Sequence, residues 1–143
     1  MTITPIYSIS ATATGGGRNG KVKTSDGSFD LTMATPKDMG GSGNGNNPEQ
    51  LFATGYAACY LGAMRFAASQ DKTLVKVPDD ATVTSTVGIG ARADKGFGLT
   101  VKLAVHLPGV DKAEAERVAA AGHEICPYSH ATKGNITVET VVV

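Results

Sequence analysis

The chain has 143 residues, a length typical of one domain, and 41% of them are hydrophobic, which is enough to bury a core. Its 13 basic and 13 acidic residues cancel, so charge gives no basis for binding nucleic acid or an anionic membrane. The N-terminus, MTITPIYSIS, has no basic segment and no apolar run, and no stretch reaches the roughly 20 apolar residues of a spanning helix. We therefore expect a cytoplasmic protein that binds neither nucleic acid nor membrane, with its two cysteines mostly reduced.

The first third of the chain is expected to form three strands. Apolar and polar residues alternate over residues 7–14, the period of a half-buried strand. GGGRNGKV follows at residues 15–22; it contains G-x-G-x-x-G and departs from the P-loop pattern only at Val22. A phosphate loop needs a helix to begin at its glycines, but strand-like residues and an Asp-Gly turn come next. The glycines therefore predict a hairpin loop around Arg18 rather than a nucleotide site.

A long helix is predicted from Pro48 to about Ser69. Asn47 is a good N-cap, Pro48 suits the first helical position, and Gln50 has the spacing of a capping box. Helical spacing predicts one apolar face, made of Leu51, Phe52, Gly55, Cys59, Gly62, Ala63 and Phe66.

The rest of the chain predicts two strands, a helix and a last strand. Alternation over residues 81–107 indicates a β pair, and Asp111 caps a second helix with a buried face of Ala115, Val118, Ala119, Gly122 and Cys126. Pro127 disfavours a helical conformation at Cys126, so the helix is expected to end or kink there. Residues 136–142 alternate again. We predict one α+β domain over residues 1–143, with antiparallel sheets packed on two main helices in the order βββ-α-ββ-α-β.

The two cysteines occupy similar places, because each lies on an apolar helix face rich in small residues. Small residues let helices approach closely, which a disulfide between Cys59 and Cys126 would require, but two inert buried thiols fit the same pattern. A buried thiol becomes a nucleophile only beside a cation that keeps its charge, best an arginine held by a carboxylate. Arg65, Arg92 and Arg117 are expected to face solvent, which leaves Arg18, embedded in glycines that let it approach another part of the protein. Glu49 is the candidate carboxylate, although the helix dipole alone would also favour an acid there.

Four separated blocks of the sequence resemble the organic hydroperoxide resistance (Ohr) family of the OsmC/Ohr superfamily. They are ATATGGGRNG, NNPEQLFATGYAACYLGAM, TVGIG followed by GFGL, and ICPYSHATKGNI. The resemblance extends from about Ile6 to the C-terminus. Two positions depart from the family pattern: Asn19 stands where Asp is common, and His130 where Asn is common.

The resemblance implies a thiol-dependent peroxidase that reduces organic hydroperoxides, including those of fatty acids, to alcohols. Cys59 would be the peroxidatic cysteine and Cys126 the resolving one, while Arg18 would stabilise the thiolate and the peroxide and Glu49 would orient Arg18. The family has no bound cofactor or metal; an external dithiol, dihydrolipoamide or a lipoylated protein, would reset the disulfide. It also implies an intertwined homodimer and a role in the response to organic peroxide stress.

The spacing of Glu49 and Cys59 adds a prediction about that dimer. Ten residues of one regular helix separate them by about 15 Å and place them on different faces. We therefore expect Arg18 and Glu49 of one subunit to complete the Cys59–Cys126 site of the other.

Two other functions stay open from the residues alone. A metal site could combine Cys126 with His123, three residues earlier, and with Cys59, His106 or His130, although no paired-ligand spacing supports zinc and His123 is expected at the surface. A non-enzymatic domain with inert buried cysteines is the other alternative.

Overall fold

The computed structural model describes residues 2–143, whose contacts divide them into two compact units, residues 2–51 and residues 52–143. The order of the strands and main helices is the predicted βββ-α-ββ-α-β, with one short helix added after the second main helix. No helix within residues 2–143 is long and apolar enough to cross a membrane. The single domain predicted over residues 1–143 stays a prediction.

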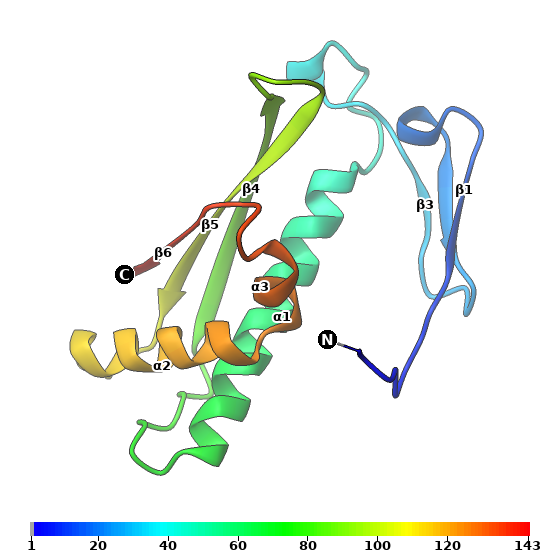
Figure 1. Cartoon of the computed structure of the whole chain (residues 1–143). Coiled ribbons are helices and arrows are strands. Elements are labelled where there is room, and N and C mark those ends of the chain that lie inside the picture. The colour runs from blue at the N-terminus through cyan, green and yellow to red at the C-terminus, as the bar shows by residue number, and fades with distance from the viewer. Residues whose placement is uncertain (1) are drawn as a thin grey trace. The chain divides into compact units, whose positions relative to one another are not determined.

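The first unit contains a three-stranded antiparallel sheet, in the order β1-β2-β3 (Figure 1). Its strands are β1 (Ala11–Thr14), β2 (Lys21–Thr24) and β3 (Asp30–Thr32). The strand predicted over residues 7–14 is present only at Ala11–Thr14, and its predicted half-burial is wrong, because all four residues of β1 are exposed. In the described part of this unit only Met33 and Ala34 are buried. The alternation of apolar and polar residues over residues 7–14 therefore does not reflect a strand that packs one face on a core.

The long helix α1 (Pro48–Gln70) begins and ends almost where the sequence predicts. The capping box forms in full: the Gln50 amide donates to Asn47 Oδ1 over 2.9 Å, and the Asn47 amide donates to Gln50 Oε1 over 3.0 Å. A short 3₁₀ helix, η2 (Lys37–Met39), lies in the connection that leads to it. Local capping chemistry therefore fixes where α1 starts.

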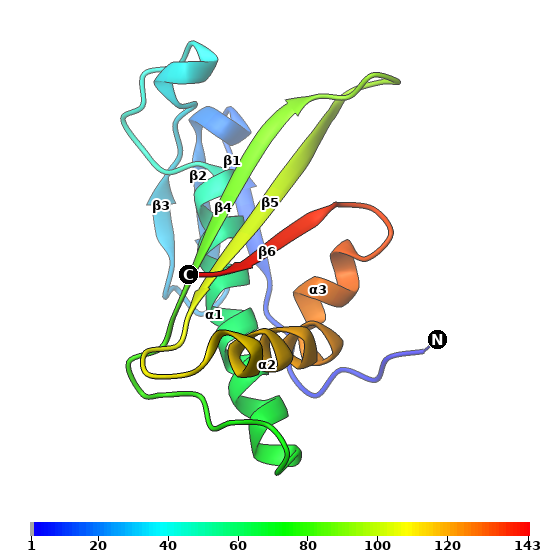
Figure 2. The same ribbon diagram turned by 90° about the vertical axis from the view of Figure 1, so that its left-hand side faces the viewer.

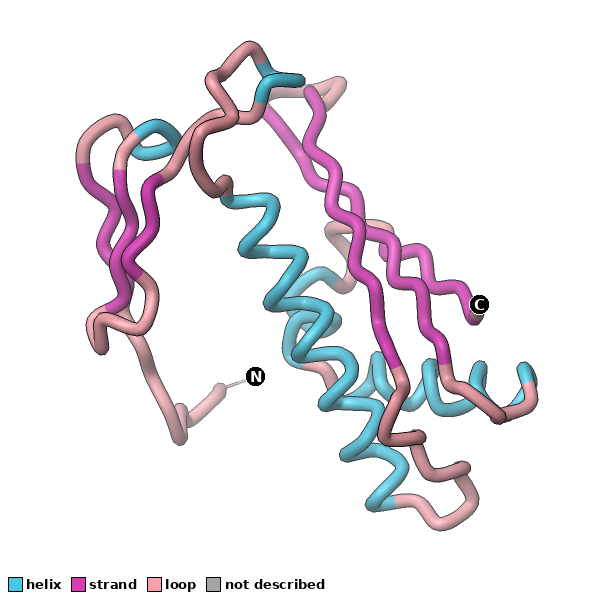
Figure 3. The backbone as a smooth tube through the Cα atoms, turned by 180° about the vertical axis from the view of Figure 1, so that it is seen from behind, coloured by secondary structure: helices cyan, strands magenta, loops and turns pink. Residues whose placement is uncertain are grey.

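The second unit contains a mixed sheet in the order β4-β5-β6 (Figure 3). β4 (Thr82–Ala91) and β5 (Phe97–His106) pair antiparallel over their full length, whereas β6 (Val138–Val142) pairs parallel with β5. The prediction of purely antiparallel sheets therefore needs correction. The chain from β5 to β6 passes through helices, a crossover that allows the second strand to run in the same direction as the first.

The core of this unit lies between α1, β5 and the second main helix, α2 (Lys112–Ile125). The face of α1 that it buries differs from the predicted one and consists of Tyr56, Tyr60, Ala63, Met64 and Ala67. Phe66, predicted to be buried, is 54% exposed. Apolar and small residues occur nearly all round α1, so sequence periodicity could not choose between its faces.

The helices α1 and α2 cross closely (Figure 2). The buried residues of α2 are those predicted: Ala115, Val118, Ala119 and Gly122. A Cβ added at Gly122 would lie 2.6 Å from Met64 Cγ, so the absence of a side chain there is what permits this approach. The predicted effect of small residues on helix packing is therefore present in the structure.

The sequence predicted that Arg65 faces solvent, but the structure binds its guanidinium to backbone carbonyl oxygens. Its guanidinium donates to the carbonyl oxygens of Val77 at 3.2 Å and Pro78 at 2.8 Å. The side chain is 37% exposed. Its hydrogen bonds connect α1 to the segment that follows the helix. Position on a helix wheel does not reveal such contacts, because the partners are backbone atoms distant in sequence.

Candidate active site

Arg18 lies in a glycine turn of the first unit. β1 and β2 are joined by a turn that contains a 3₁₀ helix, η1 (Gly17–Asn19). Gly15 and Gly17 have φ values of 65° and 64°, in the region that favours glycine, and a Cβ at Gly20 would lie only 1.9 Å from the carbonyl oxygen of Thr14. The glycines are therefore required by the turn itself, and no α-helix follows them that could hold a phosphate.

The turn presents Arg18 to Glu49 as a bidentate ion pair. Arg18 Nη2 lies 2.6 Å from Glu49 Oε1, and Nη1 lies 3.1 Å from Oε2. The hydrogen bond from Arg18 holds the pKa of the Glu49 carboxyl below its ordinary value, and the same bond raises the pKa of Arg18. Glu49 also lies in the first turn of α1, where the helix dipole favours an anion. Both groups are thus held charged, with Glu49 only 13% exposed and Arg18 37% exposed.

Asn19, one of the two departures from the family pattern, has a definite place in this turn. Its Oδ1 accepts a hydrogen bond from the Thr35 amide over 3.0 Å. An amide oxygen accepts from a backbone N–H as a carboxylate oxygen does, without the charge. The substitution therefore preserves a bond between the glycine turn and the segment after β3. The other departure, His130, is exposed.

Cys59 and Cys126 meet in the second unit. Both are free thiols, and their sulfurs lie 3.5 Å apart. Cys126 is buried, with 1% of its surface exposed, whereas Cys59 on α1 is partly exposed. Their separation of 67 positions in the sequence makes this contact a product of helix packing. A partly exposed cysteine is thus in contact with a buried one.

Pro127 determines the conformation at Cys126. α2 ends before Cys126, whose φ of −67° and ψ of 120° are extended, as expected for a residue that precedes proline. A further helix, α3 (Pro127–Thr132), begins with Pro127 in its first turn, and Cys126 is its N-cap: the Ser129 amide donates to Cys126 Sγ over 3.5 Å. The predicted break is confirmed, but α3 was missed. Pro at a first helical position was the available signal.

Burial governs the electrostatics of Cys59. It raises the pKa of the Cys59 thiol, and the hydrogen bond and charge of Cys126 raise it further, while a hydrogen bond from the Tyr128 amide lowers it. The net effect favours the neutral thiol, which is a poor nucleophile. A positive charge close to Cys59 would be needed to favour its thiolate near neutral pH.

Three aromatic side chains form a cluster beside the N-terminal half of α1. Phe52, Tyr56 and Tyr128 form a cluster with ring centroids 5.6 to 6.2 Å apart. A Cβ at Gly55 would lie 2.8 Å from the Tyr128 hydroxyl, so the glycine leaves room for the Tyr128 ring. Tyr128 is 38% exposed and gives the surface near Cys59 an apolar character.

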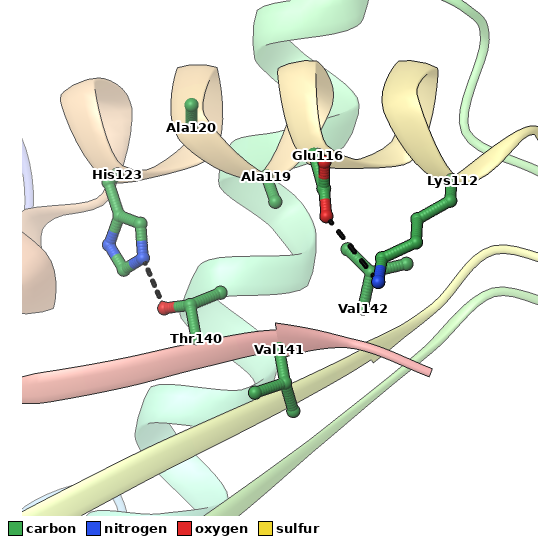
Figure 4. Close-up of a pocket in the computed structure, with 8 residues that line it drawn as sticks. All are labelled: Lys112, Glu116, Ala119, Ala120, His123, Thr140, Val141 and Val142. Carbon is green, nitrogen blue, oxygen red and sulfur yellow. Dashed lines mark hydrogen bonds and ion pairs between the residues drawn. The ribbon is translucent and has the colours of Figure 1, made fainter.

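His123 is not a surface histidine, which corrects the prediction. It is partly buried, with Nδ1 2.8 Å from Ser129 Oγ and Nε2 2.7 Å from Thr140 Oγ1, and its ring stacks at a tilt on Tyr60 with centroids 4.6 Å apart. Figure 4 shows its side chain reaching from α2 towards β6. The sequence did not identify Tyr56, Ser129 or Thr140 either, because each is an ordinary core or strand residue until its partner is known.

Two cavities lie beside His123. One, of about 440 Å³, is formed between α2 and β6 (Figure 4), and the other, of about 300 Å³, lies next to α3. The residues that line them include neither Cys59 nor Cys126. Among residues 2–143, no group of three or more His, Cys, Asp or Glu side chains is arranged to hold a metal ion. The candidate chemistry therefore resides in the two pairs, Arg18–Glu49 in the first unit and Cys59–Cys126 in the second.

Comparison with known proteins gives a consistent result. The model of the OsmC-like protein family matches residues 41–141. An organic hydroperoxide resistance protein from Xanthomonas axonopodis pv. citri is 49% identical over 134 residues, covering 93% of this chain and 92% of the relative. OhrB of Bacillus subtilis is 37% identical over 125 residues, covering 87% and 89%. The crystal structure of an organic hydroperoxide resistance protein from Legionella pneumophila superposes with a TM-score of 0.89 at 45% identity, covering 97% and 98%. This chain therefore belongs to the OsmC-like family, among the organic hydroperoxide resistance proteins.

Proposed function

We propose that this protein is a cysteine-based peroxidase that reduces alkyl and fatty-acid hydroperoxides to alcohols in the response to organic peroxide stress. Family membership supports a role in resistance to organic hydroperoxides. The observation that carries the thiol mechanism is the contact of two free cysteines, with 3.5 Å between their sulfurs and one of them accessible. A disulfide bond is about 2.05 Å long, so a small movement would join them.

In the first step, the Cys59 thiolate attacks one peroxide oxygen. The S–O bond forms as the O–O bond breaks, and the alkoxide leaves and takes a proton to become the alcohol, so that Cys59 is oxidised to a sulfenic acid. Negative charge develops on the leaving oxygen, where a guanidinium would stabilise it.

Arg18 is the proposed source of that charge. Burial raises the pKa of Cys59 and so disfavours its thiolate. Arg18 could offset this effect, because its hydrogen bonds to Glu49 fix the position of its guanidinium. We propose that Arg18 and Glu49 of one subunit of an intertwined homodimer complete the cysteine pair of the other. The helical distance of about 15 Å over ten residues supports this arrangement, since it separates Glu49 from Cys59 of its own chain.

In the second step, Cys126 attacks the Cys59 sulfenic acid. A disulfide forms and water leaves, which protects Cys59 from further oxidation. No cofactor is required within the protein; an external dithiol, dihydrolipoamide or a lipoylated protein, reduces the disulfide by thiol exchange. The rings of Phe52 and Tyr128, which lie beside each other and are not fully buried, support an apolar substrate tail over hydrogen peroxide.

Thiol counting tests this function. The reduced protein is treated with one equivalent of tert-butyl hydroperoxide, a fatty-acid hydroperoxide or hydrogen peroxide, and the remaining thiols are titrated. We expect both thiols to disappear together, fastest with the organic peroxides, and to return with dihydrolipoamide. If both stay titratable, the cysteines are inert and the peroxidase is excluded. Stoichiometric zinc in the purified protein would instead favour a metal site.

A further inference from the structure

The first turn of α3 supplies a backbone amide to Cys126. The Ser129 amide donates to Cys126 Sγ over 3.5 Å, so that Cys126 is the N-cap of α3. α3 has only six residues, and a helix this short is not stable by itself. Side-chain contacts must therefore hold this turn, and with it Cys126, in position.

A chain of four side chains makes these contacts. The Tyr56 hydroxyl lies 2.8 Å from Ser129 Oγ, which lies 2.8 Å from His123 Nδ1. The other ring nitrogen, Nε2, lies 2.7 Å from Thr140 Oγ1, and Figure 4 shows this last contact. We call Tyr56, Ser129, His123 and Thr140 the Ser129 network. It joins α1, α3, α2 and β6, so Ser129 is fixed from two directions.

Burial makes the bonds of this network costly to lose. Tyr56 is fully buried and Ser129 is 8% exposed, so a missing partner would remove a hydrogen bond from a largely buried polar group. Burial also lowers the pKa of His123, which favours the neutral imidazole with one donor and one acceptor nitrogen. The Tyr60 ring, which packs at a tilt against the imidazole with centroids 4.6 Å apart, restricts the imidazole plane. Both ring nitrogens can thus be satisfied at once by the two hydroxyls.

We propose that the Ser129 network positions Cys126 for disulfide formation, with His123, Ser129 and Tyr56 as positioning residues for the resolving step. The proposal rests on the peroxidase function above. The step itself needs no outside reagent: the Cys126 sulfur forms the S–S bond, the S–O bond of the Cys59 sulfenic acid breaks, and the thiol proton leaves with the hydroxyl as water. A second peroxide molecule can oxidise the same sulfenic acid to a sulfinic acid. The rate of disulfide formation therefore decides what fraction of the protein is inactivated in each turnover.

The chain offers a matched pair of variants to test the proposal. Tyr56 and Tyr60 lie one turn apart on α1, both are fully buried, and each loses one buried hydroxyl when changed to Phe. The Tyr60 hydroxyl donates to the Ala119 carbonyl at 2.6 Å, outside the network. Y56F breaks the bond to Ser129, whereas Y60F costs a comparable core hydrogen bond and leaves the network intact.

A second pair separates the two ends of His123. The amide of Asn reaches the place of Nδ1 and that of Gln the place of Nε2. H123N therefore retains a partner for Ser129, while H123Q retains one for Thr140. Rescue by H123N but not by H123Q would assign the effect to the Ser129 side of the network.

The measurement is single-turnover oxidation of the reduced full-length protein by tert-butyl hydroperoxide, with sulfenic acid, disulfide and sulfinic acid resolved by mass spectrometry. We expect Y56F and H123Q to form the sulfenic acid within about twofold of the unchanged protein, and the disulfide about tenfold more slowly, the effect of one lost hydrogen bond. Their sulfinic acid fraction should rise. Y60F and H123N should form the disulfide at nearly the original rate.

Thermal unfolding of the reduced variants controls for stability. Equal melting of Y56F and Y60F with unequal disulfide formation supports positioning. Disulfide formation that slows equally in Y56F and Y60F, or in neither, overturns the proposal. If the unchanged protein forms no sulfenic acid, the peroxidase function itself has failed, which is a different result from normal oxidation with unaltered resolution in Y56F and H123Q.

Discussion

The Arg18–Glu49 pair and the Cys59–Cys126 pair are built in opposite ways. The ion pair belongs to a unit with almost no core, and it is set by a glycine turn on one side and a capped helix start on the other. The thiol pair lies against the main core, where two helices cross at Gly122 and a proline redirects the chain after Cys126. Local backbone geometry positions the charges, and tertiary packing positions the sulfurs.

This difference follows from the chemistry of the two pairs. An ion pair keeps its charge most easily where water still reaches part of it, because full burial of charges costs more than their attraction returns. Two sulfurs brought within 3.5 Å need a rigid, closely packed surrounding, which small residues and a core provide. The two pairs can therefore be perturbed separately, and the largest effects are expected at the cysteines.

Replacing either cysteine should give the largest loss. C59S should reduce peroxidase turnover with dihydrolipoamide about a thousandfold, since it removes the proposed nucleophile. C126S should still oxidise once and then stall as a sulfenic or sulfinic acid, because the resolving thiol is gone. Steady-state rates and mass spectrometry of the oxidised protein measure the two effects. Turnover by C59S at the original rate would contradict the assignment.

Replacing Arg18 tests whether the ion pair serves the thiol pair. R18Q should lower the rate of Cys59 oxidation by about 100-fold, the effect of removing charge-assisted hydrogen bonds of about 1.5–3 kcal/mol. Stopped-flow oxidation measures this rate. An unchanged rate would separate the two pairs functionally.

Mixing two inactive variants tests the assignment of the pairs to different subunits. When R18Q and C59S are unfolded together and refolded, half of the dimers should be mixed. A mixed dimer then has one complete site, with Cys59 from one chain and Arg18 from the other. About a quarter of the original activity should return. No recovery, with mixed dimers verified by mass spectrometry, would place each site within a single chain.

Adding a methyl group to a glycine can disturb one pair without the other. In G20A the new Cβ would meet the Thr14 carbonyl at 1.9 Å, and backbone must move, so we expect unfolding free energy to fall by about 3 kcal/mol. In G122A the Cβ would meet Met64 Cγ at 2.6 Å, and a flexible side chain can yield at about 1 kcal/mol. Urea unfolding of the reduced proteins compares them. The opposite order would contradict the close approach in the glycine turn.

The smallest expected effect is the pH dependence of the ion pair. The pKa of Glu49 is lower in the folded protein, so its contribution to stability is complete above its ordinary pKa of about 4.3 and is lost as pH falls through the lowered value. With Arg18 partly exposed, we expect about 1 kcal/mol. Urea unfolding from pH 6 to pH 3 should show this loss in the unchanged protein and a shallower slope in E49Q. Identical slopes would mean that the pair does not stabilise the fold.

Features that depend on neighbouring residues were predictable from the sequence. The order of strands and main helices, the capping box at Asn47 and Gln50, the glycine turn around Arg18 and the break at Pro127 are all present in the structure. Each rests on the conformational preferences of a few consecutive residues, which the rest of the protein does not overrule.

Features that depend on distant partners were decided only by the tertiary structure. The buried face of α1, the parallel β6, the contacts of Arg65 and the Ser129 network could not be read from periodicity. α1 is apolar or small on most of its surface, so the choice of face belongs to the sheet and helix that pack on it. The sequence by itself determined where the chain turns and which residues could react. Packing determined which of these residues meet, because a contact contributes to stability only when the rest of the fold brings both partners together.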